Sequence, residues 1–504
     1  MSRLSRSFLL VAAFFGLEKL LGFLRYVVIA RQFGYSAQSD AFYVANNLPD
    51  LILTLISGGA LAVAFIPVLS EVLEKAGRQR LWELFSRVAN LVFLTTALLS
   101  ILIAIFALPL VRYWIAPGFT PDQQILAANL MRVNLLATCL LSLGGLVIAG
   151  LQANQHFLLP ALAPAMYDLG SLFGVFILAP STGVRLGPLT LPGLGMGIYG
   201  PMAGYVIGAA LFVLVQVPGL VHYQFRWTPA FNFRDPGVLK VLSLMGPRVM
   251  TAGFIYLIFI AQENIATRLA TGSVSFLNYG WLFMQVPETI IGTAIATALL
   301  PTISELFARS DQTTFKETLN RSLRVILALT IPCAGLIAVG IPPFVGILGG
   351  SAADQTMIVW ITRAFLVGLT GHAMLEVSSR SFYAQQKALI PLLTSGLTLA
   401  VFIPLAVVLA KGLDAVGIAL ANSLVFTGEA LLLWFLLNRS YPGVINTRGA
   451  LGRALLASVL AALLSFLVVL LPFNPLFLSL VGMALGALVA LPFILPELKL
   501  LIHL

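Results

Sequence analysis

The sequence has few charged residues for its length. Only 10% of its 504 residues are Asp, Glu, Lys or Arg, whereas 59% are hydrophobic. Soluble proteins carry about 25% charged residues, so this chain lacks the charge to cover a water-facing surface. The shortage excludes an ordinary soluble domain and indicates a protein that places most of its length in lipid.

Cysteine, nucleotide-binding loops and metal-ligand patterns are scarce as well. Cys139 and Cys333 lie in separate apolar runs, which excludes a disulfide framework. No Gly-rich loop has the Walker spacing, and no set of His, Cys or carboxylates has metal spacing. We therefore expect no cofactor, no metal and no ATP hydrolysis. The longest outer connections are short and Asp354 is isolated there, which disfavours an enzyme such as a membrane glycosyltransferase.

The net charge of +10 does not indicate nucleic-acid binding. The basic residues punctuate the apolar runs instead of forming one stripe, which is typical of the positive-inside rule. Arg3 and Arg6 before an apolar stretch suggest a signal peptide at first sight. That stretch contains Glu18, Lys19 and Arg25 and has no small-residue cleavage site, so we interpret it as the first membrane helix.

Apolar runs of about 20 residues, each long enough to cross the hydrocarbon layer, recur from end to end. They lack the alternation of barrel strands, so they predict an all-α polytopic membrane protein. Pro49 and Pro287 fall inside the second and eighth runs and predict bent or broken helices. Most basic residues fall on the side of the termini, which places both termini in the cytoplasm. Fourteen transmembrane helices are expected, at 8–31, 38–70, 84–111, 124–150, 158–180, 195–219, 238–268, 272–304, 322–346, 356–384, 388–410, 414–437, 450–471 and 477–498.

Two internal matches indicate a duplication. The stretch 60–71, ALAVAFIPVLSE, recurs at 294–305 as AIATALLPTISE, and 153–160, ANQHFLLP, recurs at 384–391 as AQQKALIP. Six spans separate equivalent positions, so the two copies have the same membrane orientation. Parallel repeats are typical of transporters whose substrate site lies between the halves. We predict an N-lobe at 1–220 and a C-lobe at 221–440 around a central cavity, with an extra C-terminal helix pair at 441–504.

Charged residues inside the spans are candidate site residues. A charge in hydrocarbon costs at least ~2.5–3.5 kcal/mol on insertion scales, so such residues usually face a cavity. In the first span, Lys19 and Arg25 predict a cationic site for an anionic head group such as phosphate, which suits the planar guanidinium fork. Arg248 and Arg268 of the seventh span are the counterpart in the other half. Structural pairing, for example of Glu18 with Arg25, and helix-end snorkelling are the alternatives.

Three further residues are candidates for ion coupling. Glu263 lies in the seventh span with Arg248. His372 and Glu376, in the tenth span, are four residues apart and therefore adjacent on one helix face. Histidine titrates near physiological pH, so a proton is the coupling ion that this pair would serve. Structural roles for all three remain open.

Several motifs resemble the MurJ (MviN) family of lipid II flippases. They include Leu21-Gly-Phe-Leu-Arg25, Ser39-Asp-Ala-Phe42, Ala64-Phe-Ile-Pro67 and Ala116-Pro-Gly-Phe119. The resemblance continues through Met245-Gly-Pro247, Thr271-Gly-Ser-Val-Ser275, Leu300-Pro301 and Phe382-Tyr-Ala384, and it covers essentially the whole chain.

This resemblance implies a fold, a function and a site. It implies two six-helix lobes of the multidrug/oligosaccharidyl-lipid/polysaccharide exporter superfamily, alternating between inward-open and outward-open states. The implied activity is translocation of lipid II, the undecaprenyl-diphosphate-linked peptidoglycan precursor, across the bacterial cytoplasmic membrane, with the cell-wall synthesis machinery as a partner. The family's basic cavity residues match Lys19 and Arg25, and its acidic residue at the start of the second span matches Asp40. Its last two helices hold the lipid tail.

The chain departs from the family at three positions that usually carry arginine. These positions are Leu53, Thr54 and Leu282, and we hypothesise that Arg248 and Arg268 compensate. The missing cations favour an alternative substrate, another lipid-linked oligosaccharide of the capsule or O-antigen type. An ion-coupled drug exporter is disfavoured because a basic cavity repels cationic drugs. A non-transporting scaffold is disfavoured because unpaired charges in mid-span are costly to keep.

Overall fold

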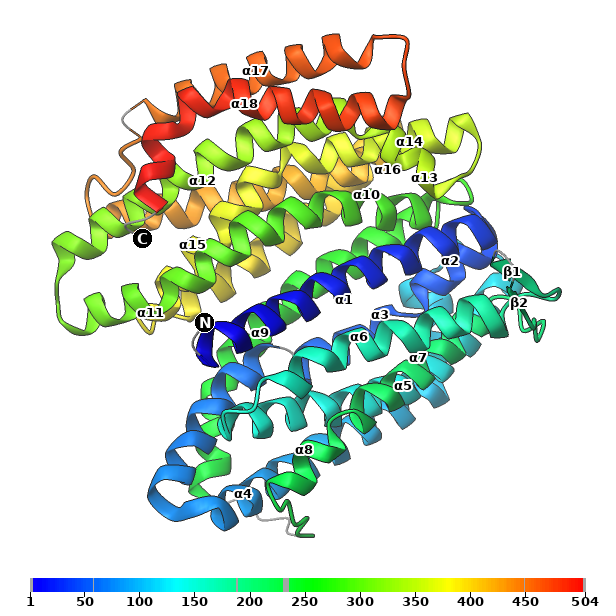
Figure 1. Cartoon of the computed structure of the whole chain (residues 1–504), viewed down its shortest axis with the longest axis vertical. Helices are drawn as coiled ribbons and strands as arrows, with labels where there is room; N and C mark the ends of the chain where they lie inside the picture. Colours follow the sequence, from blue (N-terminus) through cyan, green and yellow to red (C-terminus); the bar gives the residue numbers. More distant parts are fainter. Residues whose placement is uncertain (1–2, 58, 187–188, 230–234, 448, 502–504) are drawn as a thin grey trace. The chain divides into compact units, whose positions relative to one another are not determined.

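The computed structural model describes residues 3–57, 59–186, 189–229, 235–447 and 449–501, and nearly all of them are helical (Figure 1). Contacts group the chain into two compact units, 1–272 and 273–504. The helix Pro236–Ala266 (α9) packs on helices of unit 1, although the sequence match begins the second copy near residue 221. The boundaries of the duplication therefore remain a prediction about sequence.

Unit 1 contains nine helices among its described residues, three short π-helical segments and a small β-hairpin. Their bounds are α1 Arg3–Phe33, α2 Ala37–Val44, α3 Asn47–Ile52, η1 Leu53–Ser57, α4 Gly59–Leu110, η2 Val111–Ile115, α5 Pro121–Ala153, α6 Leu158–Phe173, η3 Gly174–Leu178, β1 Val184–Leu186, β2 Leu189–Leu191, α7 Tyr199–Leu214, α8 Val217–His222 and α9 Pro236–Ala266. The two strands pair antiparallel, with Arg185 opposite Thr190.

All secondary-structure elements among the described residues of unit 2 are helices. Its elements are α10 Ser273–Glu288, η4 Thr289–Thr293, α11 Ala294–Ala308, α12 Gln312–Gly340, α13 Pro342–Leu348, α14 Ala352–Val367, α15 Leu369–Ala384, α16 Leu389–Ser440, α17 Ala450–Val469 and α18 Pro475–Leu501. The C-terminal pair, α17 and α18, packs on α12 through small residues that include Ala457 and Ala461. Leu455 and Leu488 on the outer faces of this pair are exposed, as expected for lipid-facing helices.

The prediction of an all-α polytopic fold is confirmed. Among the described residues, ten helices are long and apolar enough to cross a membrane, or eleven if the bent pair of α14 and α15 forms one span. Helices α4 and α16 have 52 residues each, about 78 Å if straight, which is more than twice the hydrocarbon thickness. Each is interrupted by one non-helical residue, Gly77 in α4 and Asp414 in α16, and α4 changes direction there (Figure 1). The total of fourteen spans remains a prediction.

The duplication is visible in local structure. Gln155 and Gln386 occupy the same position in the second sequence match, and both have a left-handed backbone, with φ of 61° and 59°. The residue before each one folds back onto its helix: Asn154 donates to the Gly150 carbonyl at 2.9 Å, and Gln385 donates to the Ser381 carbonyl at 3.1 Å. The two copies therefore end these helices by the same turn.

The predicted breaks at the two prolines are confirmed. Pro49 lies in α3, directly before the π-helical segment η1, and Pro287 lies at the end of α10, directly before η4. Proline removes a backbone donor and crowds the preceding turn, which interrupts the regular hydrogen-bond ladder. Short π-helical segments within helices occur frequently at functional sites. Both breaks are therefore candidate functional positions.

Candidate functional site

Arg25 on α1 is the centre of a buried charge cluster in unit 1. Its Nη1 lies 3.0 Å from Oδ1 of Asp168 on α6, and the two side chains are only 14% and 6% exposed. An arginine–carboxylate pair compensates the cost of removing either charge from water. Arg25 Nε is buried and has no hydrogen-bond acceptor among the described residues. Because buried donors are nearly always satisfied, this N–H is a donor that an anionic ligand can use.

Three tyrosines enclose the Arg25 guanidinium. Its carbon lies 5.3 Å from the ring centroid of Tyr26, 5.8 Å from that of Tyr167 and 5.4 Å from that of Tyr205. Cations within ~6 Å of an aromatic face are attracted to it. The rings come from α1, α6 and α7, so three helices hold one charged group. This cage fixes the guanidinium in place more firmly than an ion pair alone.

Close packing of α6 against α7 brings these side chains together. Gly170 on α6 and Gly174 at the start of η3 face Gly204 and Gly208 on α7, and a Cβ on Gly204 would lie 2.8 Å from the Gly174 Cα. A Cβ on Gly208 would overlap the carbonyl oxygen of Tyr167. Small residues at four-residue spacing let membrane helices approach to backbone contact. The glycines therefore position Tyr167 and Asp168 beside Tyr205 and Arg25.

A second carboxylate lies at the break in the same unit. Asp50 follows Pro49 on α3, is exposed, forms a side-chain hydrogen bond with Tyr256 on α9 and lies within electrostatic range of Arg25. One guanidinium therefore faces two carboxylates, Asp50 and Asp168. The cluster is less cationic than the sequence alone suggested.

The other predicted residues of unit 1 lie in different environments. Lys19 is exposed and pairs with its neighbour Glu18 at 3.4 Å, so the proposed pairing of Glu18 with Arg25 is replaced by Glu18–Lys19 and Arg25–Asp168. Lys19 still acts electrostatically on Asp168. Asp40 is buried in the first turn of α2, where its Oδ2 accepts the Gly272 N–H at 2.6 Å.

The predicted residues of the seventh span are not all described. Glu263 is buried and accepts a hydrogen bond from Asn47 at 2.8 Å. Arg268 is exposed and donates to Asn264 at 3.3 Å. The side chain of Arg248 lies outside the described residues. The structure thus gives Glu263 and Arg268 partners on their own unit, and it does not bring Arg268 to Arg25.

Unit 2 has a cluster at its own break. Glu376 and Arg380 on α15 form an ion pair of 3.0 Å, and Arg380 also donates to the Thr293 carbonyl of η4 at 3.2 Å. Glu288, directly after Pro287, accepts a hydrogen bond from the Thr293 hydroxyl at 3.2 Å. As in unit 1, one cation, Arg380, lies near two carboxylates, Glu376 and Glu288. It contacts the π-helical segment η4 through the Thr293 carbonyl.

His372 belongs to a different contact set from Glu376. Its Nε2 lies 3.2 Å from Oδ1 of Asn422 on α16, and its ring lies 4.5 Å from Phe426 and 5.4 Å from Trp281. Two aromatic rings and one amide surround it, and the side chain is buried. The two residues share the helix but contact different neighbours.

Sequence reasoning missed Asp50, Asp168 and Glu288. A signal for two of them was present, because Pro49-Asp50 and Pro287-Glu288 occupy corresponding breaks of the duplicated spans. Asp168 was visible as a carboxylate inside the fifth predicted span. Its partner was not, because Arg25 lies 143 positions away and on another helix.

Both units also have a carboxylate shared by two arginines near a helix end. Asp235, at the start of α9, pairs with Arg80 at 2.9 Å and with Arg87 on α4. Burial alone would raise the pKa of Asp235, but the Gly237 amide and the two guanidinium groups outweigh it and lower the pKa below that of a free aspartate. In unit 2, Glu497 on α18 pairs with Arg324 at 2.8 Å and with Arg453.

Broken apolar helices that hold buried charges within a duplicated bundle define a polytopic membrane transporter. The fold agrees with solved structures of the multidrug/oligosaccharidyl-lipid/polysaccharide exporter superfamily. A lipid II flippase MurJ in an inward closed conformation superposes with a TM-score of 0.78 at 23% identity, covering 96% of this chain and 98% of that one. An inward-facing multidrug resistance MATE family transporter superposes with a TM-score of 0.68 at 12% identity, covering 85% and 95%.

The family model described as lipid II flippase MurJ matches residues 29–490, so the chain belongs to the MurJ family. The lipid II flippase MurJ of Burkholderia cenocepacia is 29% identical over 419 residues, which cover 80% of this chain and 79% of that protein. The probable lipid II flippase MurJ of Vibrio cholerae is 24% identical over 478 residues and 89% of each chain. The resemblance noted in the sequence is confirmed.

Proposed function

We propose that this chain translocates lipid II from the inner to the outer leaflet of the bacterial cytoplasmic membrane by alternating access. Membership of the MurJ family and the agreement with an inward closed MurJ structure support the proposal. The observation that carries it is the enclosed Arg25, whose Nε donor has no acceptor among the described residues. A diphosphate is the part of lipid II that such a group recognises.

The Arg25 cluster also indicates how binding is linked to a conformational change. A diphosphate that binds the free Nε donor and also takes the Nη1 donor of Arg25 displaces Asp168, which frees α6 from its ion pair with α1. A ligand shifts a conformational equilibrium only by the difference in its affinity for the two states. We infer that the Arg25–Asp168 pair is present in one state and broken in the other, so that exchange of Asp168 for diphosphate supplies such a difference. Lys19 and Asp40 are proposed to contact the substrate at the edge of this site, with contributions from Arg248 on α9 and from Arg268 just after α9.

Transport of this kind leaves the substrate's covalent bonds unchanged, so we assign no catalytic residue. The membrane potential, worth ~2.3 kcal/mol per charge per 100 mV, is one source of the driving force. Proton or ion coupling through Glu263, His372 or Glu376 is a second source. We further propose that both termini lie in the cytoplasm and that the cell-wall synthesis machinery supplies and consumes the substrate.

A second candidate is the flipping of another lipid-linked oligosaccharide. It is favoured by the neutral residues Leu53, Thr54 and Leu282 where the family usually has arginines, and by the extra carboxylate of Asp50 near Arg25. Such a substrate also carries a polyprenyl diphosphate, so Arg25 would serve it equally. Export of cationic drugs receives less support, because the central group of the unit 1 cluster is a guanidinium.

Complementation separates these candidates. Bacteria depleted of their own lipid II flippase would express this chain, and outer-leaflet lipid II would be quantified. Rescue that is lost with Arg25→Ala is the expected result. Normal insertion and expression without rescue would contradict lipid II as the substrate, and accumulation of capsule or O-antigen intermediates would then be measured.

A further inference from the structure

A basic cavity lies at one end of unit 2, away from the Glu376–Arg380 cluster. It has a volume of about 890 Å³. Its walls are the first turns of α12, the connection from α16 to α17 and the end of α18. The lining residues are Lys316, Glu317, Asn320, Arg321, Arg324, Gly443, Asn446 and Leu500.

The cavity wall is held in place by specific contacts. The Asn320 amide donates to the carbonyl groups of Val444 and Asn446, both at 2.8 Å, and so fastens the α16–α17 connection to α12. Gly443 has a φ of 85°, a conformation that favours glycine. A Cβ at this position would lie 3.1 Å from the Lys316 Nζ. The connection is therefore shaped to leave room for the lysine ammonium.

The cavity carries excess positive charge. Arg321 pairs with Glu317 at 3.2 Å, and Arg324 shares Glu497 with Arg453. Among the lining residues, the three cations Lys316, Arg321 and Arg324 therefore outnumber the one carboxylate, Glu317. Lys316 forms no ion pair in the part of the chain that the structure describes. The buried Nε of Arg324 likewise has no acceptor among the described residues. The cavity therefore has a net charge of two positive units, and the Lys316 ammonium and the Arg324 Nε are available to bind an anion.

The position of the cavity in the membrane indicates which anion. The basic residues of this region are those that the positive-inside rule places at the cytoplasmic surface. Leu500 lines the cavity. Leu451 and Leu455 on the first turns of α17, just after the connection, are 43% and 51% exposed. A polar, basic opening next to exposed leucines matches a phosphate head group with attached acyl chains.

We propose that this cavity binds the phosphate head group of an anionic glycerophospholipid from the inner leaflet. Lys316 and Arg321 contact the phosphate, Asn320 and the α16–α17 connection form the wall, and the acyl chains lie along α17. Basic pockets between membrane helices on the cytoplasmic side are known to bind anionic head groups. None of the residues that line this cavity belongs to the set proposed to bind the transported head group.

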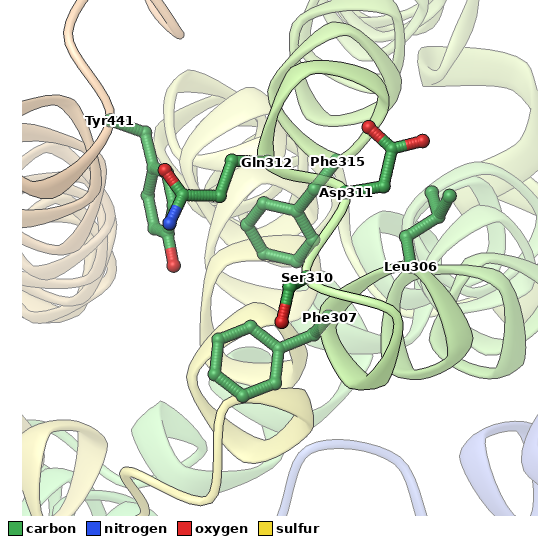
Figure 2. Close-up of a pocket in the computed structure, with 7 residues that line it drawn as sticks. All are labelled: Leu306, Phe307, Ser310, Asp311, Gln312, Phe315 and Tyr441. Carbon is green, nitrogen blue, oxygen red and sulfur yellow. The ribbon is translucent and has the colours of Figure 1, made fainter.

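A neighbouring cavity does not share these properties. Figure 2 shows a smaller space of about 220 Å³ where the Phe315 ring contacts the rings of Phe307 and Tyr441, with Asp311 on the side away from Tyr441. The Asp311 carboxylate accepts the Thr314 N–H at 3.0 Å and so caps α12. The residues that line this space include a carboxylate and no basic side chain, so they do not suit an anion. The proposed lipid site is therefore confined to the cavity that contains Lys316.

The test is lipid binding by the purified full-length protein, without lipid II. Protein in nanodiscs of phosphatidylcholine, with and without phosphatidylglycerol, would be delipidated in steps, and retained phosphatidylglycerol would be counted by native mass spectrometry. Lys316→Gln should weaken phosphatidylglycerol binding about fivefold, corresponding to the ~1 kcal/mol of one basic side chain at an anionic surface. Glu317→Gln should strengthen it, because a competing carboxylate is removed.

Arg309→Gln is the matched control, because Arg309 is a basic residue of the same unit that pairs with Glu305 at 2.5 Å and does not line the cavity. Its binding should equal that of the parent chain. The proposal would be overturned if Lys316→Gln and Glu317→Gln both bound phosphatidylglycerol as the parent chain does. It would also be overturned if Arg309→Gln lost as much binding as Lys316→Gln. Displacement of the lipid by millimolar inorganic phosphate would also overturn it, because it would indicate a site for a free anion.

Discussion

Each unit has a helix interrupted in the same way, but the charged residues near the interruption lie in different environments. In each, a proline and a carboxylate precede a π-helical segment, Pro49-Asp50 in unit 1 and Pro287-Glu288 in unit 2. In unit 1 the associated cation is Arg25, enclosed by three tyrosines and only 14% exposed. In unit 2, Arg380 is 22% exposed and its partner Glu376 is 38% exposed. Duplication therefore supplied two similar scaffolds, of which only unit 1 holds its guanidinium in a near-dry aromatic cage.

This difference assigns the two clusters different roles. Electrostatic interactions strengthen as water is excluded, so Arg25 is the better anion-binding group. Arg380 and its partner Glu376 are more exposed, so water weakens their interaction more than that of Arg25 with Asp168, and we expect Arg380 to contribute less to binding of the diphosphate.

Replacing Arg25 and Arg380 one at a time should give the largest difference in lipid II transport between the two units. Arg25→Ala removes charge-assisted hydrogen bonds worth about 1.5–3 kcal/mol each, so we expect lipid II transport to fall ~100-fold. Arg380→Ala should lower it by less than about tenfold, because exposed pairs contribute ~1 kcal/mol or less. Flipping of labelled lipid II in proteoliposomes measures both. Equal losses would remove the distinction between the units.

The packing that builds the unit 1 cage can be broken by one methyl group. Gly208→Ala places its Cβ against the Tyr167 carbonyl and should cost about 1–3 kcal/mol through overpacking. At Gly428 on α16 an added Cβ meets nothing within 4 Å, so Gly428→Ala should be neutral or gain up to ~1 kcal/mol from helix propensity. Thermal unfolding in detergent compares them. A Gly208→Ala protein as stable as the parent would show that α6 and α7 are not in backbone contact.

Neutralising one carboxylate in each cluster sharpens the comparison. Asp168→Asn removes the group that competes with diphosphate for Arg25, so we expect lipid II to bind about tenfold more tightly, or ~1.4 kcal/mol, while turnover falls. Glu376→Gln should change the affinity less than twofold. Equilibrium binding to the purified proteins tests this. Weaker binding by Asp168→Asn would mean that Asp168 orients Arg25 and does not compete for it.

The smallest expected effect is on stability and concerns the ion pairs that Asp235, at the start of α9, forms with Arg80 and Arg87 on α4. The folded pKa of Asp235 lies below the ~3.9 of a free aspartate. The ion pairs with Arg80 and Arg87 therefore stabilise the fold fully above about pH 4, and this contribution is lost as the pH falls through the folded pKa. The stability difference between the parent chain and Asp235→Asn should shrink over that range. A stability difference that persists at lower pH would mean that Asp235 stabilises the fold through packing and neutral hydrogen bonds and not through its charge.

The sequence predicted the fold better than the site. Hydropathy predicted the all-helical membrane fold, though the total of fourteen spans remains a prediction. The internal sequence matches indicated the duplication, and Pro49 and Pro287 indicated the breaks in the helices, because each of these is a local signal. Arg25 was found because a charge in an apolar run is conspicuous. Its cage was not, because Tyr167, Asp168 and Tyr205 come from helices whose approach depends on a glycine stripe that only the packed structure reveals. The pairing of charges between helices likewise required the coordinates. The sequence suggested Glu18 as the partner of Arg25, whereas in the structure Arg25 pairs with Asp168 and Glu18 pairs with Lys19.

The most direct test of the central claim is outer-leaflet lipid II in bacteria that depend on this chain for flipping, with Arg25→Ala and Arg25→Lys compared at matched expression. The account predicts rescue by the parent chain, none by Arg25→Ala and partial rescue by Arg25→Lys, since lysine keeps the charge but lacks the planar fork. Full rescue by Arg25→Ala would contradict the assignment of the enclosed guanidinium as the group that binds the diphosphate.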